Sequence, residues 1–170
     1  EGPMGRVRQM SIARIYPRTY EVALPTLTEN GAYHLTLLPS LLDIDGFQLD
    51  QDGDGVAGEA SDGLSVDLIV DTVPPRVPQY TPAGDIAGTV TNVDVWFTER
   101  MDPATLNAST ISIRNPANGV VPLSSVQQVG LNRWRVSFPA QTVVGLYHVR
   151  LSTNITDFAG NSIQNSATNL

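Results

Sequence analysis

The sequence predicts an all-β protein made of two related β-sandwich units, and three observations support this prediction. Hydrophobic and polar residues alternate in short segments along the chain, which is the pattern of half-buried strands. Glycine and proline are frequent, with 14 and 12 residues among 170, so many turns are expected. A shift of 114 positions, which takes Val7 to Val121, places residues 7–51 over residues 121–165 without a gap. Such a repeat indicates two copies of one folding unit.

The repeat is densest in two segments. Residues 20–25 (YEVALP) align with 134–139 (WRVSFP), and residues 31–37 (GAYHLTL) align with 145–151 (GLYHVRL). Further on, Asp43 aligns with Asp157. Since each copy must fold as its own unit, we expect a residue that both copies share to serve the fold. A residue confined to one copy can serve another purpose.

The alternation of apolar and polar residues with period 2 predicts where the strands lie. In the first copy, Tyr20, Val22 and Leu24 share one face, which we expect to point inward, and two more strands are expected over 33–37 and 64–70. Strands of the second copy are expected over 92–98, 110–114, 120–129, 134–138 and 147–151. Asn118 and Gly119 are a two-residue hairpin signal, and only residues 103–107 are predicted as a helical turn.

A Pro-Pro pair at 74–75 predicts a stiff connector, because proline cannot enter a central strand. We therefore expect domains at 1–73 and 74–170. The first copy lacks counterparts of the strands in 76–114, and the second lacks a counterpart of strand 64–70. Either the ends of the sequence cut through repeats of a longer protein, or another chain completes an open sheet edge through strand exchange or homo-oligomerisation.

Composition excludes several classes of function. A net charge of −7 and a pI near 4.6 argue against nucleic acid as a partner, since phosphate binding needs a basic face. All ten basic residues are arginines, which excludes chemistry that depends on a lysine. No apolar run is long enough for membrane insertion. No spacing of Ser, His and Asp suggests a catalytic triad, so we expect a protein that is not an enzyme.

Four segments of the second copy point to a known family: PP at 74–75, YTPAG at 80–84, VDVWFTERMDPAT at 93–105 and TDFAGN at 156–161. In these segments the chain resembles the bacterial Ig-like domains of S-layer and other large surface proteins. The resemblance implies tandem immunoglobulin-like β-sandwiches with antiparallel Greek-key sheets. It also implies a spacer or adhesion role in a larger secreted or cell-surface bacterial protein, with neighbouring Ig-like domains as partners. The first copy departs from the family pattern at Asp45 and Phe47, where Ala and Asn are usual.

Residues 50–62 (DQDGDGVAGEASD) are the one segment with the pattern of a binding site. Carboxylates at Asp50, Asp52 and Asp54 converge when the chain curls tightly, as in the first half of an EF-hand loop. The twelfth position is Ser61, so either Glu59 or Asp62 would close the site. The predicted metal ligands are Asp45, Asp50, Asp52, Asp54, the carbonyl of Val56, Glu59 and Asp62.

Calcium is the expected cofactor of this loop, because crowded carboxylates repel one another without a cation. A solvated acidic turn is the alternative, and magnesium fits less well because it rarely uses a cage made only of protein ligands. Asp45 is included because the second copy has Ala159 at the aligned position, so the fold does not require an acid there.

Other polar and aromatic residues are weaker candidates. His34 and His148 align with each other, which favours an ordinary surface position over zinc binding. Trp96 alternates out of phase with Val95 and Phe97, so it either packs against a neighbouring domain or loop or stacks on a sugar. The second possibility would make the chain a carbohydrate-binding or ligand-binding accessory module of an extracellular protein.

Overall fold

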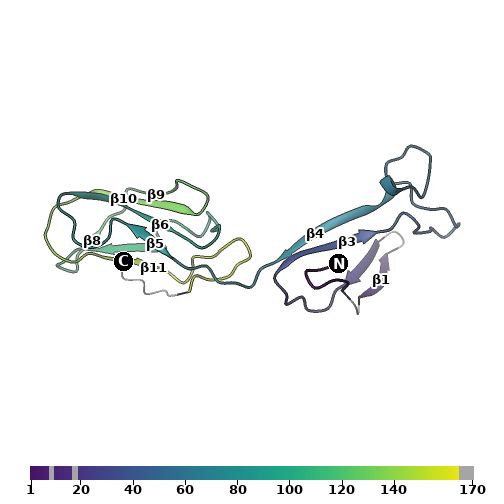
Figure 1. Cartoon of the computed structure of the whole chain (residues 1–170), viewed down its shortest axis with the longest axis horizontal. Coiled ribbons are helices and arrows are strands. Elements are labelled where there is room, and N and C mark those ends of the chain that lie inside the picture. Colours follow the sequence, from purple (N-terminus) through teal and green to yellow (C-terminus); the bar gives the residue numbers. More distant parts are fainter. Residues whose placement is uncertain (8–9, 17–18, 165–170) are drawn as a thin grey trace. The chain divides into compact units, whose positions relative to one another are not determined.

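The structure, a computed structural model, describes residues 1–7, 10–16 and 19–164. Contacts divide the chain into two compact units, Glu1–Thr72 (unit 1) and Val73–Leu170 (unit 2). Regular structure is almost entirely strand, as predicted (Figure 1). None of the described helices could cross a membrane. Positions 8, 9, 17, 18 and 165 of the predicted repeat lie outside the described residues.

Unit 2 consists of two antiparallel sheets. Its strands are β5 (Gln79–Thr81), β6 (Val90–Trp96), β7 (Ile111–Arg114), β8 (Val120–Val121), β9 (Ser125–Gln128), β10 (Arg133–Gln141) and β11 (His148–Leu151). One sheet has the order β5-β6-β10-β9, and the other has the order β11-β7-β8. Hydrophobic side chains from both sheets belong to one buried cluster, so unit 2 is a β-sandwich.

The core of unit 2 follows the predicted alternation. Val93 and Val95 of β6 are buried, and so are Trp134, Val136 and Phe138 of β10. The second sheet and its connections contribute Met101, Leu106, Ile111, Ile113, Val121, Val149, Leu151, Ile155 and Ile163. Successive side chains of a strand point to opposite faces, so the residues between the buried ones point away from the core.

Two predictions for unit 2 need correction. The strand expected over 120–129 is two strands, because Pro122 interrupts it; β8 pairs with β7 and β9 pairs with β10, so the chain passes from one sheet to the other here. Residues 103–107 form a turn without a helix, in which the amide of Thr105 donates to the carbonyl oxygen of Asp102 at 3.1 Å. The Asp102 carboxylate accepts a hydrogen bond from the amide of Ala104 at 2.9 Å.

Unit 1 consists of two antiparallel strand pairs. Its elements are β1 (Ser11–Tyr16), β2 (Thr19–Ala23), β3 (Gly31–Leu37), the 3₁₀ turn η1 (Ala60–Asp62) and β4 (Leu64–Val70). β1 pairs with β2, and β3 pairs with β4 along its whole length. β1 and η1 were not predicted from the sequence.

The repeat holds at the level of strand register. In unit 1, Ile12 pairs with Val22, and in unit 2 the residues 114 positions later, Val126 and Val136, pair in the same way. The hairpin β1-β2 therefore corresponds to the hairpin β9-β10 residue by residue.

A side-chain contact of a tyrosine also recurs, once in each unit. The hydroxyl of Tyr33 donates to the carbonyl oxygen of Glu29 at 3.0 Å, and that of Tyr147 donates to the carbonyl oxygen of Val143 at 3.0 Å. Both contacts span four residues, as a tyrosine corner requires. The glycine two residues before each tyrosine has a positive φ, 136° in unit 1 and 139° in unit 2, which a residue with a Cβ rarely adopts.

The shared aspartates close equivalent turns. Asp43 accepts a hydrogen bond from the amide of Phe47 at 2.9 Å, and Asp157 accepts one from the amide of Asn161 at 2.9 Å. Both are Oδ1 contacts that span four residues, which is the behaviour expected of an aspartate that stabilises a turn.

Aligned side chains are less buried in unit 1 than in unit 2. Tyr20 is 60% exposed, whereas Trp134 at the aligned position is 4% exposed, and Leu37 is 38% exposed against 1% for Leu151. Of the face predicted to point inward, Tyr20 is exposed, whereas Val22 and Leu24 are half-buried. In unit 2, β6 pairs beside β10 and β7 belongs to the opposite sheet, and the described part of unit 1 has no strand aligned with either. Among the described residues of unit 1, Tyr33 is the only buried hydrophobic residue.

Candidate metal site

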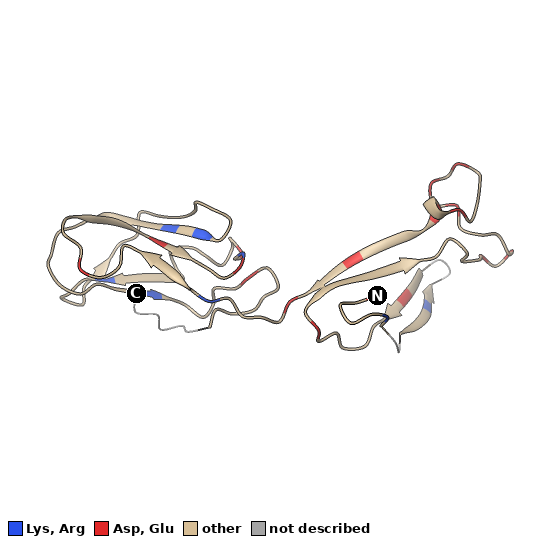
Figure 2. Ribbon diagram, viewed as in Figure 1, with Lys and Arg blue, Asp and Glu red and all other residues tan. Residues whose placement is uncertain are grey.

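The acidic segment lies in the connection from β3 to β4, residues 38–63 (Figure 2). Backbone hydrogen bonds hold the base of this connection together. The amide of Leu49 donates to the carbonyl oxygen of Leu41 at 3.1 Å, and the amide of Gly58 donates to that of Leu49 at 2.9 Å. These bonds return the chain on itself, so acidic residues distant in sequence become neighbours.

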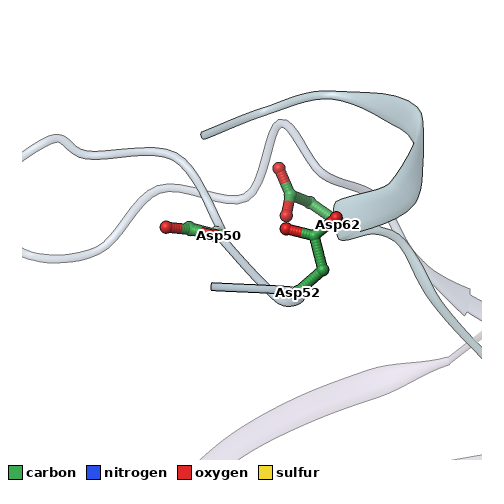
Figure 3. Close-up of side chains that lie close together, drawn as sticks. All are labelled: Asp50, Asp52 and Asp62. Atoms are coloured by element: carbon green, nitrogen blue, oxygen red, sulfur yellow. The ribbon is translucent and has the colours of Figure 1, made fainter. Parts of the chain in front are cut away.

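Two overlapping groups of carboxylates gather in this connection. Oxygen atoms of Asp50, Asp52 and Asp62 lie within 4.8 Å of one another (Figure 3). Oxygen atoms of Asp52, Asp54 and Glu59 meet the same limit. Figure 3 shows the carboxylates of Asp52 and Asp62 pointing toward each other. Asp52 belongs to both groups and is therefore the centre of the acidic cluster.

Local hydrogen bonds curl the chain around these side chains. Asp50 accepts hydrogen bonds from the amides of Gly53 at 2.8 Å and Gly55 at 3.2 Å, and Asp54 accepts one from the amide of Val56 at 2.7 Å. The two glycines have φ values of 75° and 90°, which explains why glycine alternates with aspartate here. The structure thus contains the tight curl that the sequence predicts.

Asp62 differs from the other acids because it is fully buried, with 0% exposure, in η1. Its Oδ1 accepts a hydrogen bond from the amide of Gln51 at 2.7 Å, and its Oδ2 accepts one from the amide of Glu59 at 3.1 Å. Burial raises the pKa of Asp62, but the backbone hydrogen bonds outweigh it, and the net pKa is lowered. A carboxylate fixed in its charged form therefore lies at the base of the loop.

The remaining predicted ligands are placed differently. The carboxylate of Glu59 accepts a hydrogen bond from the hydroxyl of Ser61. Val56 is exposed, and its carbonyl oxygen is the predicted backbone ligand. Asp45 lies outside both carboxylate groups, and its amide donates to Asp43 at 2.9 Å. The structure brings Asp62 to Asp50 and Asp52, whereas Glu59 faces Asp52 and Asp54.

This set of side chains offers only oxygen atoms, which suits a hard cation. Three carboxylates within a few ångströms repel one another strongly unless a cation lies between them. Calcium takes six to eight oxygen ligands in flexible geometry, including carboxylates and backbone carbonyls. The residues present fit calcium in the type of their ligand atoms.

Two other candidate residues of the sequence, Trp96 and His34, have partners within their own units. The guanidinium of Arg133 lies 4.7 Å from the ring centroid of Trp96, so intramolecular stacking accounts for the position of this tryptophan. Nδ1 of His34 lies 2.6 Å from Oδ1 of Asp67 on the neighbouring strand, and both side chains are exposed. His148 is also exposed.

Sequence reasoning missed an ionic cluster on the outer face of β6. Asp94 is 2% exposed, because Arg133 and Arg135 of β10 lie over it. Nε of Arg135 lies 2.7 Å from Oδ1 of Asp94, and its Nη2 lies 2.9 Å from Oδ2. These hydrogen bonds, together with Arg133, outweigh burial and lower the pKa of Asp94 to about 2. The cluster depends on the register of β6 against β10, which no local pattern in the sequence fixes.

No curated protein matches the chain. Among solved structures, the N-terminal part of the bacterial S-layer protein SbsC is similar with 23% identity and a TM-score of 0.42. That likeness covers 54% of this chain and 22% of the other. Domains 1–6 of surface layer protein SbsC are similar with 24% identity and a TM-score of 0.43 over 55% of this chain and 13% of that one.

The chain therefore spans less than a quarter of the length of these solved proteins. The comparison with families gives a match over more than half of the chain. The model of the bacterial Ig-like domain matches residues 71–169, which include all the strands of unit 2. With the sandwich of unit 2 and the strand register that unit 1 shares with it, this match shows that the chain belongs to the family of bacterial Ig-like domains.

Proposed function

We propose that the chain is a non-catalytic, calcium-stabilised Ig-like segment of a larger secreted or cell-surface bacterial protein, in which it serves as a spacer or adhesion module. Its family membership and its second, related unit support a role in a series of tandem domains. In such a series the neighbouring Ig-like domains are the closest partners.

The observation that carries the calcium proposal is the position of Asp62. This carboxylate is buried, ionised and held by two backbone amides, and it lies within 4.8 Å of the exposed carboxylates of Asp50 and Asp52. A fixed anion beside two exposed anions costs electrostatic free energy, which a divalent cation would offset.

The proposed role of calcium is structural. η1 ends at Asp62, and β4 begins at Leu64, so an ion held by Asp50, Asp52 and Asp62 would tie the loop to the start of β4. β4 is the only strand that pairs with β3 in the described part of unit 1. Calcium would therefore stabilise the β3-β4 pair from the end at which the loop connects the two strands.

Unit 2 has one hollow whose lining side chains can be stated. It is lined by Ser109, Thr110, Ile111, Ser112, Arg150, Leu151, Ser152 and Thr153. These residues supply hydroxyls and one guanidinium but neither a carboxylate nor a histidine, so the lining lacks a general base to activate a hydroxyl.

The test compares the unfolding of the chain in calcium and in a chelator. At calcium a hundredfold above the dissociation constant, binding to the folded state alone adds about 2.7 kcal/mol of stability. For a unit of this size, that stabilisation corresponds to roughly 10 °C or more in Tm. The variant D52N should lose most of this increase, because Asp52 belongs to both carboxylate groups.

Two controls sharpen this experiment. D85N removes the same charge from an exposed position in unit 2 and should keep the full response to calcium. D45N tests the one predicted carboxylate that lies outside both groups and should also keep it. Identical melting curves of the unmodified chain with and without calcium would refute calcium stabilisation, and an equal loss in D52N and D85N would refute the assigned site.

A further inference from the structure

The hollow of unit 2 is a feature that the proposed function leaves unused. All of its lining residues come from two adjacent segments, 109–112 at the start of β7 and 150–153 at the end of β11. The amide of Ser152 donates to the carbonyl oxygen of Thr110 at 2.8 Å, which holds the two segments side by side. The hollow has a volume of about 260 Å³. Pockets for drug-sized ligands measure about 300–1,000 Å³, so we expect a smaller ligand here.

A guanidinium and a hydroxyl lie together on the outer face of this strand pair. Arg150 of β11 is directly opposite Ser112 of β7. The residues beside them, Ile111 and Leu151, are buried in the core of unit 2. Successive side chains of a strand point to opposite faces, so Arg150 and Ser112 point outward, and both are exposed.

The other hydroxyls of the hollow differ in what they can still bind. The hydroxyl of Thr110 donates to the carbonyl oxygen of Thr105 at 2.7 Å, so it is a fixed part of the wall. Oγ of Ser152 accepts a hydrogen bond from the amide of Asn154 at 3.1 Å and can still donate. The hydroxyl of Thr153 makes no hydrogen bond to any described residue. Two of these hydroxyls can therefore serve a ligand.

Arg150 carries the only charge among the lining side chains. In the described part of the chain, no carboxylate forms a salt bridge with it. The next pair along the same face, Arg114 and His148, adds no negative charge. A guanidinium attracts an anionic group and holds a carboxylate through two parallel N–H···O hydrogen bonds. A carboxylate is therefore the group that best fits the charged side of the hollow.

The repeat separates the polar residues of the hollow from the fold. Leu151 aligns with Leu37, so we expect this leucine to serve the fold that both units share. The polar residues around it align with residues of other kinds: Arg150 with Thr36, Ser152 with Leu38 and Thr153 with Pro39. The shared fold therefore does not require a polar hollow at this position.

The charge of the whole chain limits what the ligand can be. Its net charge is −7, so a ligand with many negative charges would be repelled. A single guanidinium balances a single carboxylate. The hydroxyls around it both donate and accept hydrogen bonds, as the hydroxyls of a sugar do. A sugar ring with one carboxylate matches this combination.

We propose that the hollow of unit 2 binds a carboxylated sugar residue of a glycan. The guanidinium of Arg150 holds the carboxylate, and the hydroxyls of Ser112, Ser152 and Thr153 bind those of the sugar. This binding goes beyond a spacer role, because it gives the segment a specific ligand. It is independent of the calcium loop, which lies in unit 1.

The test is an NMR titration of the full chain with methyl β-glucuronide. Methyl β-glucoside, in which a hydroxymethyl group replaces the carboxylate, is the matched control. The buffer is freed of calcium with a chelating resin, so failure of the calcium proposal does not affect the result. For a ligand with about 14 non-hydrogen atoms, the expected dissociation constant is about 1 mM. Methyl β-glucoside should bind about tenfold more weakly, and the shifted signals should lie in residues 109–112 and 150–153.

Three variants identify the groups that bind. R150Q should weaken the binding of methyl β-glucuronide about tenfold and leave that of methyl β-glucoside unchanged. T153V keeps the shape of the side chain without its hydroxyl and should weaken both sugars about fivefold. R114Q removes a positive charge from the same outer face outside the hollow and should preserve both affinities.

Several results would overturn the proposal. These are equal affinity for the two sugars, an equal loss in R150Q and R114Q, or no shift of the signals of the lining residues at tens of millimolar sugar. Sulfate that binds as tightly as methyl β-glucuronide would show a site for an adventitious ion only, and would also refute recognition of a sugar.

Discussion

The two units have the same strand register but differ in burial. The hairpin β1-β2 repeats the pairing of β9-β10, and a tyrosine and an aspartate make the same contacts in both units. Yet the described residues of unit 2 bury a continuous core, whereas those of unit 1 bury one hydrophobic side chain, Tyr33. Local sequence therefore determines the hairpins and turns, whereas burial of their inner face also depends on other strands, such as β7, β8 and β11 of the opposite sheet in unit 2.

The largest expected effect compares two leucines at aligned positions. L151A removes a side chain that is 1% exposed and should lower the free energy of unfolding of unit 2 by about 2–5 kcal/mol. L37A removes a side chain that is 38% exposed and should cost less than about 1 kcal/mol. Urea denaturation followed by circular dichroism measures both. Equal losses would mean that Leu37 is buried in solution and that the two faces do not differ.

The second prediction concerns the ionic cluster of Asp94, Arg133 and Arg135 in unit 2. The pKa of Asp94 is lowered from 3.8 to about 2, so its charged form stabilises the folded state by roughly 2 kcal/mol near neutral pH. Because the folded pKa is the lower one, this stability is present above about pH 4 and is lost as the pH falls toward 2.

The variant D94N should abolish this part of the acid dependence in the unfolding of unit 2. E21Q, at the position in unit 1 aligned with Arg135, is the control and should leave it unchanged. Unfolding curves at a series of pH values measure the effect. If D94N and the unmodified chain lose stability in parallel below pH 4, the two arginines do not hold this carboxylate.

The smallest predicted change in stability concerns the tyrosine corner, which the two units share. Y33F and Y147F each remove a hydroxyl that donates to a carbonyl four residues earlier, at 3.0 Å in both cases. Each should cost about 1 kcal/mol, with Y33F costing more because Tyr33 is the more deeply buried of the two. Thermal unfolding of the two variants measures this. A loss in only one unit would show that the corner is not a common feature of the repeat.

The sequence predicts the all-β class, the repeat and the buried positions of unit 2, because alternation and aligned positions are local properties. It does not predict the cluster of Asp94 with Arg133 and Arg135, since that contact joins residues about 40 positions apart through strand register. The exposure of Tyr20 was also missed. Alternation shows which side chains share a face, but only the strands on the opposite sheet decide whether that face is buried.

The acidic loop, too, could be predicted only in part from the sequence. The alternation of Asp and Gly at 50–55 predicts the curl, because each Asp accepts amides a few residues ahead. Asp62, in contrast, is placed by η1 and by a hydrogen bond from Gln51, eleven residues earlier. Spacing alone therefore left Glu59 and Asp62 as alternatives, and their different neighbours emerge only from the folded connection.

The tyrosine corner has a consequence for the order of events in folding. Its hydroxyl and its carbonyl are only four residues apart, so closing the contact orders little chain. The contact is present in unit 1, although the described part of that unit has no strands aligned with β6 and β7. We therefore expect it to form before strands distant in sequence pair, so that the start of β3 is fixed early in folding.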